Sequence, residues 1–263
     1  MAYPAGMHLT LPLLLALVAA AFLAGALDAI GGGGGLIMVP ALLAAGLPPH
    51  LALGTNKGQS FFGSLSAAFR YARAGLVDGR RSRVTFPAAF LGALGGAALV
   101  LVIRPEVLRP IVLGLLVLAA ILVTATRPRA GNGGSAPRGP RRHWILAALI
   151  ALVVGAYDGF FGPGAGTFYI AAFVAFLALP MARASADAKV ANFASNIAAA
   201  ILFAHRGVIL WGIALPLAGG QILGGFVGAH LAVRRGDSFV RAVVLIMVLA
   251  LVLKIGRDLY LAR

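Results

Sequence analysis

Residues 157–168 read YDGFFGPGAGTF, a polar and glycine-rich stretch between two long apolar runs. Gly162, Pro163, Gly164 and Gly166 cannot sustain a regular helix. In hydrocarbon an unpaired backbone amide costs several kcal/mol, so irregular backbone persists only inside protein or beside a wet cavity. The stretch therefore predicts a helix that is broken within the membrane, with the carboxyl group of Asp158 beside the break.

The composition supports a membrane setting for this break. Of 263 residues, 61% are hydrophobic and 11% charged, and the mean hydropathy is +0.97. A soluble domain is about half apolar and about a quarter charged. The apolar runs have about 15 to 22 residues, which spans a hydrocarbon core of about 30 Å, and they lack period-two alternation. We predict an all-α integral membrane protein, a polytopic helical bundle with about eight to ten hydrophobic segments. The candidate segments are 9–28, 36–47, 57–72, 84–103, 108–125, 144–158, 166–180, 190–205, 211–233 and 240–257.

Several classes of protein do not fit the sequence. The chain has no cysteine and its five histidines are scattered, which argues against a metal site. We find no Ser/His/Asp grouping in a plausible order and expect neither an enzyme nor a cofactor. A net charge of +15 would indicate nucleic acid in a soluble protein. Here the arginines crowd the connections around 70–83 and 127–142, as cytoplasmic loops do. We therefore expect contact with anionic lipid headgroups and no nucleic-acid partner.

The chain contains two copies of one unit. At an offset of 130, residues 25–34 match 155–164, and Asp28 meets Asp158. Further on the offset becomes 132, and Lys57 meets Lys189. A chance match of apolar stretches would align Leu and Ala more readily than such rare residues. We predict a first transmembrane repeat at 1–125, a basic flexible cytoplasmic linker at 126–143 and a second transmembrane repeat at 144–263.

Arginine placement indicates how the repeats are oriented. The connection at 70–83 holds five arginines, whereas its counterpart at 204–211 holds only Arg206. This difference favours inverted repeats, with five crossings per half and both termini outside. The segments 36–47 and 166–180 are short. If they dip into the membrane without crossing it, the number of crossings in each half would no longer be odd.

A second glycine-rich break precedes the short apolar segment of the first half. Paired, Gly/Pro-interrupted segments in two related halves are the best sequence indication of a transporter's central site. The helix after each break would direct free N–H groups and its positive dipole end into the break. Alternatively, the glycines serve only close helix packing. The candidate substrate-binding residues of the two breaks are Gly32, Gly34, Gly162, Pro163, Gly164 and Gly166.

Lysine is rare in this chain, with three residues in all. Two of them, Lys57 and Lys189, hold the same repeat position, where each is predicted to open an apolar helix. A charged residue inside the membrane is functional by default, although snorkelling to a surface is the alternative. Polar residues follow each lysine at i+3 and i+7, on one helix face. The candidates here are Thr55 and Asn56 as helix caps, with Lys57, Ser60, Ser64, Lys189, Asn192, Ser195 and Asn196.

Together these groups predict an anion pocket at the interface between the repeats. Asp28 and Asp158 are the candidate coupling residues, as proton carriers; the alternatives are cation ligands, ion-pair partners or helix caps. Gln221 is a further candidate substrate-binding residue, although an interhelical hydrogen bond would also explain it. It lies in LAGGQILGGFVGAH, where glycines four residues apart are typical of tight helix contacts.

At these residues the chain resembles the TauE/SafE family of sulfite and organosulfur-anion membrane transporters. The motifs are LDAIGGGGGLIMVPALLAAG, LGTNKGQSFFGSLSAAFRYARAG, YDGFFGPGAGTF, AKVANFASNIAAAILF and WGIALPLAGGQILGGFVGAHLA, within residues 10–255. The resemblance implies a multi-pass carrier of two related halves in the bacterial inner membrane. It also implies transport of small sulfur anions such as sulfite or sulfonates, coupled to the proton gradient, without a cofactor.

Other functions remain open at this point. A passive anion channel of the same architecture would conduct without gradient coupling. A non-catalytic membrane subunit would anchor a larger complex and bind no substrate of its own. A homo-oligomer is compatible with the sequence but not indicated by it.

Overall fold

The computed structural model describes residues 10–108, 110–112, 114–115 and 140–261, and in these residues it contains helices and no strands. Four helices are long and apolar enough to cross a membrane: Leu11–Gly31, Gly79–Val102, Arg142–Phe160 and Trp211–Val240. The predicted polytopic all-α membrane fold is thereby confirmed. Most of the predicted segment 108–125 and of the linker 126–143 lies outside the described residues.

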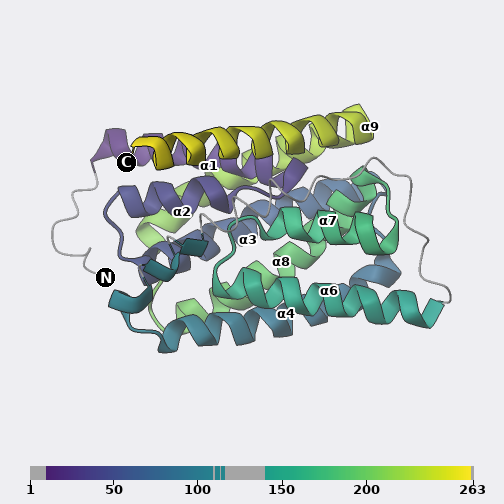
Figure 1. The fold of residues 1–263 in the computed structure, drawn as a ribbon, viewed down its shortest axis with the longest axis horizontal. Coiled ribbons are helices and arrows are strands. Elements are labelled where there is room, and N and C mark those ends of the chain that lie inside the picture. Colours follow the sequence, from purple (N-terminus) through teal and green to yellow (C-terminus); the bar gives the residue numbers. More distant parts are fainter. Residues whose placement is uncertain (1–9, 109, 113, 116–139, 262–263) are drawn as a thin grey trace.

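The described helices form one bundle (Figure 1). They are α1 (Leu11–Gly31), α2 (Gly35–Ala44), α3 (Pro49–Arg73), α4 (Gly79–Val102), α6 (Pro140–Phe160), α7 (Ala165–Leu177), α8 (Met181–His205) and α9 (Trp211–Leu261). Within α9 the backbone is non-helical at Gly236, which separates the two apolar segments predicted at 211–233 and 240–257. The beginning of α1 and the C-terminal end of α9 lie at the same end of the bundle (Figure 1).

Both glycine-rich stretches break a helix, as predicted. Between α1 and α2, Gly32 has a φ of 82°, and between α6 and α7, Gly162 has a φ of 95°. These left-handed conformations favour glycine. After the first break the chain runs back along α1, because Met38 and Leu42 of α2 join a buried cluster with Leu17 of α1. Each break therefore joins a long helix to a short returning one.

The two breaks meet at the centre of the molecule. A Cβ atom added at Gly35 would lie 3.0 Å from the Cα of Pro163, and one at Gly166 would lie 2.5 Å from the Cα of Gly32. Such approaches require glycine on at least one side. Two pieces of irregular backbone, one from each half of the chain, therefore contact each other inside protein.

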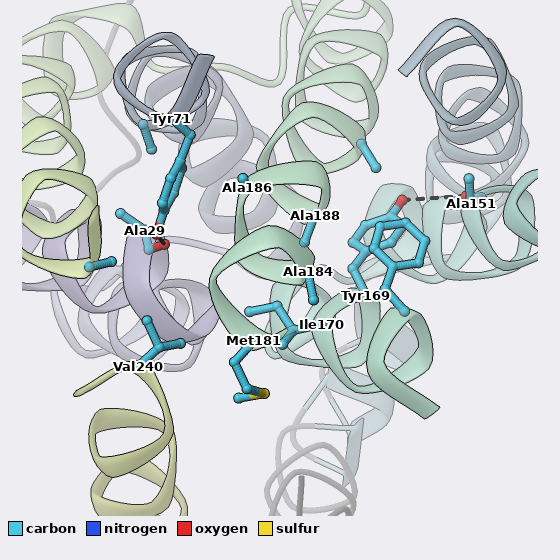
Figure 2. Packing of buried hydrophobic residues seen from close by; sticks show 14 of the residues in the cluster. Ala29, Tyr71, Ala151, Tyr169, Ile170, Met181, Ala184, Ala186, Ala188 and Val240 are labelled. Carbon is cyan, nitrogen blue, oxygen red and sulfur yellow. Dashed lines mark hydrogen bonds between the residues drawn. The ribbon is translucent and has the colours of Figure 1, made fainter. Parts of the chain in front are cut away.

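Helix α8 runs through the interior between two buried tyrosines (Figure 2). The Tyr71 hydroxyl donates to the Ala29 carbonyl oxygen over 2.9 Å, and the Tyr169 hydroxyl donates to that of Ala151 over 3.4 Å. The helix surface between them is lined by small side chains, among them Ala184 and Ala188. These alanines let neighbouring helices approach α8 closely.

Glycine stripes pack two further pairs of helices. In α9, a Cβ atom at Gly220 would lie 2.6 Å from the carbonyl oxygen of Val18 in α1. A Cβ atom at Gly224 would overlap the carbonyl oxygen of Phe22 in the same helix α1. In α4, a Cβ atom at Gly92 would overlap the carbonyl oxygen of Leu152 in α6. The predicted tight helix contact is thus present, and each stripe packs on a helix of the other half.

Matching hydrogen bonds show that α3 and α8 run in opposite directions. Asp187, near the start of α8, accepts the N–H of Asp78, which follows α3, over 3.0 Å. Thr55, near the start of α3, accepts the N–H of Leu210, which follows α8, over 3.1 Å. The two bonds join positions related by the offset of 132. We retain the two inverted repeats as a proposal, and these matching contacts support it.

One prediction about the lysine helices is wrong. Helices α3 and α8 begin about two turns before Lys57 and Lys189, so neither lysine opens a helix. Thr55 and Asn56 lie inside α3 and do not cap it. The true starts follow from prolines, since Pro49 opens α3 and Pro180 precedes α8. The turns before each lysine mix small apolar residues with buried polar ones, among them Thr55, Asn56, Ser185 and Asp187, so hydropathy placed both helix starts too late.

Candidate functional site

A cavity of about 20 Å³ lies where the two breaks meet α3, α8 and α9. A volume of this size holds about one water molecule. Both halves of the chain contribute to its wall, as predicted for a pocket between the repeats. The lining residues are Asp28, Gly34, Gly35, Asn56, Lys57, Ser60, Asp158, Gly162, Gly166, Asn192, Asn196 and Gln221.

The first ion pair at this cavity joins Lys57 of α3 to Asp158 of α6. Both side chains are 2% exposed. The Lys57 Nζ also donates to the Oδ1 of Asn196 over 2.9 Å. The second carboxylate oxygen of Asp158 accepts from the Nδ2 of Asn192 over 2.9 Å and from the hydroxyl of Ser195. This carboxylate thus has three side-chain donors, which is how a buried charge is stabilised.

The second ion pair joins Lys189 of α8 to Asp28 of α1, with 2.8 Å between Nζ and Oδ2. Lys189 is fully buried, whereas the side chain of Asp28 is 18% exposed. The other oxygen of Asp28 accepts the N–H of Gly34, at the start of α2, over 3.3 Å. Lys189 is also 3.5 Å from the Oδ1 of Asn192, which thereby lies between the two ion pairs. The surroundings of Asp28 are the looser of the two.

The pairing crosses between the halves of the chain. Each lysine pairs with the aspartate of the other half, so the four charges at the centre sum to zero. The predicted anion pocket stays a proposal: each ammonium group is paired with a carboxylate, which is one of the alternatives considered for Asp28 and Asp158. The snorkelling alternative is wrong, because both lysines are buried in ion pairs. Separating such a buried pair without replacing a partner costs about 3–5 kcal/mol.

Most of the predicted residues come together here, and some do not. Thr55 holds the backbone of Leu210, and the Ser64 hydroxyl donates to the carbonyl oxygen of Ser60 in its own helix over 2.9 Å. The residues of the breaks that do not line the cavity shape the backbone: Gly32 packs on Gly166, Gly164 precedes α7 in a left-handed conformation, and the Pro163 carbonyl accepts from the Tyr157 hydroxyl over 2.6 Å.

Gln221 lies in the cavity wall and is 3% exposed. Among the described residues its side chain makes no hydrogen bond, so the interhelical bond considered from the sequence is not observed. The Oε1 of Gln221 would lie 3.0 Å from a Cβ atom added at Gly25 and 2.5 Å from one added at Gly63. Two glycines therefore leave room for this amide, and its NH₂ group is left for an occupant of the cavity.

The sequence reasoning missed a second buried charge cluster, away from the cavity. Arg81 of α4 forms an ion pair with Asp187 of α8, and both are buried. Asp78, in the connection before α4, lies 3.3 Å from the same guanidinium. Burial by itself would raise the pKa of Asp78. The N–H groups and charges of Arg81 and Arg80 lower it by more than burial raises it, so the pKa of Asp78 is below its ordinary value. In the sequence, Asp187 lies in the connection before the helix predicted to open at Lys189, so no pattern marked it as a buried carboxylate.

Broken helices that meet inside the bundle, beside buried and paired charges, define a class of protein. They are the architecture of secondary transporters, whose irregular backbone lines the central site. Groups of three or more metal-ligating side chains are absent from the described ranges.

Comparison with known proteins gives the family. The model of the family described as Sulfite exporter TauE/SafE matches residues 17–255. A probable membrane transporter protein YfcA of Escherichia coli K12 is 40% identical over 238 residues, 90% of this chain and 87% of its own. A probable membrane transporter protein ORF9 of a Sinorhizobium species is 37% identical over 246 residues, 94% and 93% of the two chains. A third, from Haemophilus influenzae, is 37% identical over 252 residues, 96% and 98% of the chains.

No solved structure matches the chain. The chain belongs to the TauE/SafE family, and it is a multi-pass membrane transporter of the bacterial inner membrane. It is not an enzyme.

Proposed function

We propose that the chain is a secondary carrier of small anions of the sulfite or organosulfonate type, coupled to the proton gradient. The observation that carries the proposal is that two buried lysines form ion pairs with the two aspartates that line one cavity between the halves of the chain. Lysine is costly inside a membrane and is retained there for a function. The family description points to the same class of substrate.

The cavity offers the donors that an oxyanion needs. An ammonium group gives charge-assisted hydrogen bonds, and neutral amide donors add to them. Lys57 lines the cavity, and Lys189 lies behind Asp28 of its wall. The side chains of Asn192, Asn196 and Gln221 add amide groups to that wall. The N–H of Gly34, at the positive end of α2, contributes as helix N-termini do in anion sites.

Proton coupling follows from the paired charges. A lysine can bind an anion only when its aspartate releases it, and a buried carboxylate without a partner must take a proton or lose much solvation energy. Asp28 and Asp158 are therefore the proposed proton carriers. In this scheme the anion replaces a protonated aspartate as the partner of the lysine, and the centre never holds an uncompensated charge.

The size of the cavity adds a requirement. Room for about one water is too little for sulfite or a sulfonate, so the halves must move apart to admit the anion. Movement of one repeat against the other around a central site is the usual way in which such folds alternate access.

A ligand panel tests the proposal. Sulfite, thiosulfate, methanesulfonate and acetate are added to the purified protein, and the midpoint of thermal unfolding is measured. We expect the sulfur oxyanions to raise it, since a ligand that binds the folded state stabilises it. No shift with any anion would contradict the proposal and favour a non-catalytic membrane subunit. In proteoliposomes, anion flux that ignores an imposed pH gradient would favour a passive channel.

A further inference from the structure

The two ion pairs hold equivalent places in the two halves but have different surroundings. Asp158 accepts from Asn192 and Ser195 in addition to Lys57. At the positions related by the offset of 132, the first half has Ser60 and Gly63. Among the described residues, Asp28 gains only the N–H of Gly34 beside Lys189. A proton on Asp158 would therefore disrupt more hydrogen bonds than a proton on Asp28.

The looser pair is also the one beside an uncommitted polar group. Gln221 packs on Gly25, one helical turn before Asp28 on the same face of α1. The equivalent position of the first half is Ala89, so the tighter pair lacks such a neighbour. Gln221 lines the cavity, and its amide makes no hydrogen bond in the described part of the structure, so a ligand in the cavity could complete it.

We propose that the two ion pairs have separate roles, an inference that rests on the anion-carrier function proposed above. The pair of Lys189 and Asp28 opens to admit one monovalent anion together with one proton. The proton binds the Oδ2 of Asp28, the Nζ of Lys189 turns from Asp28 to an oxygen of the anion, and the amide of Gln221 donates to a second oxygen. The pair of Lys57 and Asp158 stays closed and holds the two halves together.

The charge of the centre is unchanged by this step. Before binding, two ammonium groups and two carboxylates sum to zero, and afterwards the added anion and the added proton cancel. The loaded and empty forms of the carrier are then both neutral at the centre, which avoids the cost of a net charge in the membrane. Transport of a monovalent anion with its proton is therefore electroneutral.

The other groups around Asp28 fit this assignment. Helix α8 contributes Lys189, α3 contributes Lys57 and the buried hydroxyl of Tyr71, and α6 contributes Asp158. The residues that α2, α7 and α9 bring to the cavity have no titratable group. The Tyr71 hydroxyl is already used on the carbonyl of Ala29. Among these groups, Asp28 is thus the proton acceptor whose existing hydrogen bonds a proton would disturb least.

Proton uptake during binding tests the assignment. Methanesulfonate is added to purified protein in weak buffer with a pH indicator, because this anion carries no proton of its own. We expect about one proton taken up per anion bound by the unchanged protein. The variant Asp28→Asn should bind the anion with no uptake. The control is the double variant Arg81→Met with Asp187→Asn, which removes a buried ion pair away from the cavity; its binding should still take up about one proton.

Uptake of about one proton that persists in Asp28→Asn would assign the proton to Asp158 and overturn the inference. Binding without proton uptake in the unchanged protein would overturn it as well, while leaving anion binding itself standing. An unchanged protein that binds no methanesulfonate and no sulfite would overturn the carrier function and the inference together.

A second measurement does not depend on any variant folding. Methanesulfonate uptake into proteoliposomes is driven either by an acidic exterior or by a potassium diffusion potential set with valinomycin. The pH gradient should accelerate uptake, and the potential should leave the initial rate unchanged. Uptake that is driven by the potential and does not respond to the pH gradient would contradict electroneutral co-transport of the anion with a proton.

Discussion

Gly162 is the residue at which the shape of the backbone and the charge of the site meet. Its φ of 95° favours glycine, and an added Cβ atom would lie 2.8 Å from the Nζ of Lys57 and 3.0 Å from the Oδ1 of Asp158. The break is therefore needed to bring a long cationic side chain alongside the backbone. The glycine does more than relieve helix packing, the alternative that the sequence left open.

Replacing Gly162 by alanine should abolish anion transport. The methyl group would strain the backbone by about 1–3 kcal/mol and displace the ammonium group of Lys57. Gly46→Ala is a matched control, because Gly46 has a φ of 91° and open space around its Cβ position. We expect both variants to unfold at lower temperature and only Gly162→Ala to lose transport in proteoliposomes. Equal transport by the two variants would remove Gly162 from the site.

The sequence predicts the chemistry of the central residues better than their partners. The rarity of lysine, together with the repeat, was enough to select Lys57 and Lys189. The exchange of partners between the halves was not predictable, because it depends on how the halves pack. The zero net charge of the centre results from this pairing of each lysine with the aspartate of the other half. The sequence alone did not show that pairing.

At the scale of helices, glycine stripes set the distances within the bundle. A Cβ atom at Gly96 of α4 would overlap the carbonyl oxygen of Ala156 in α6, so the two backbones are in contact there. Gly96→Ala should lower the unfolding temperature, because α4 and α6 would have to move apart. The control is Gly95→Ala on the same helix, whose Cβ position meets nothing within 4 Å. Equal unfolding temperatures for the two variants would show that the contact contributes nothing.

The buried pair of Arg81 and Asp187 fixes the start of α4 to the start of α8. Asp187→Asn leaves the guanidinium with only the more exposed Asp78 as a charged partner and should destabilise the protein by up to about 3–5 kcal/mol. Adding Arg81→Met should restore most of that loss, because the double change removes both buried charges. Thermal unfolding of the single and double variants measures this. An unchanged midpoint in Asp187→Asn would mean that the pair does not hold the two helices.

Helix boundaries were the weaker part of the sequence prediction. The long apolar helices were placed within a few residues, since hydrophobic length is a direct signal. The predicted starts of α3 and α8 were too late because buried polar residues such as Thr55 and Asp187 interrupt the apolar pattern before each lysine. In a polytopic bundle an interior helix need not be apolar, so a hydropathy pattern misses its ends.

For the whole molecule, the proposed inverted repeats make a test of sidedness. The connection after α3 and the connection after α8 hold equivalent places in the two halves, and they should lie on opposite sides of the membrane. The chain has no cysteine, so single cysteines can be placed without background. Arg80→Cys should react with an impermeant maleimide only from the cytoplasmic side, and Arg206→Cys only from outside; both positions are exposed. Reaction of both from one side would contradict inverted repeats.

The central claim is that a buried lysine, exchanged between an aspartate and an anion, carries the substrate. Methanesulfonate uptake by the double variant Lys189→Gln with Asp28→Asn tests it most directly. Removing both partners leaves no unpaired charge, so the variant should keep an unfolding temperature near that of the unchanged protein. The account predicts a folded protein that transports no anion. A folded double variant that transports methanesulfonate at the unchanged rate would contradict it.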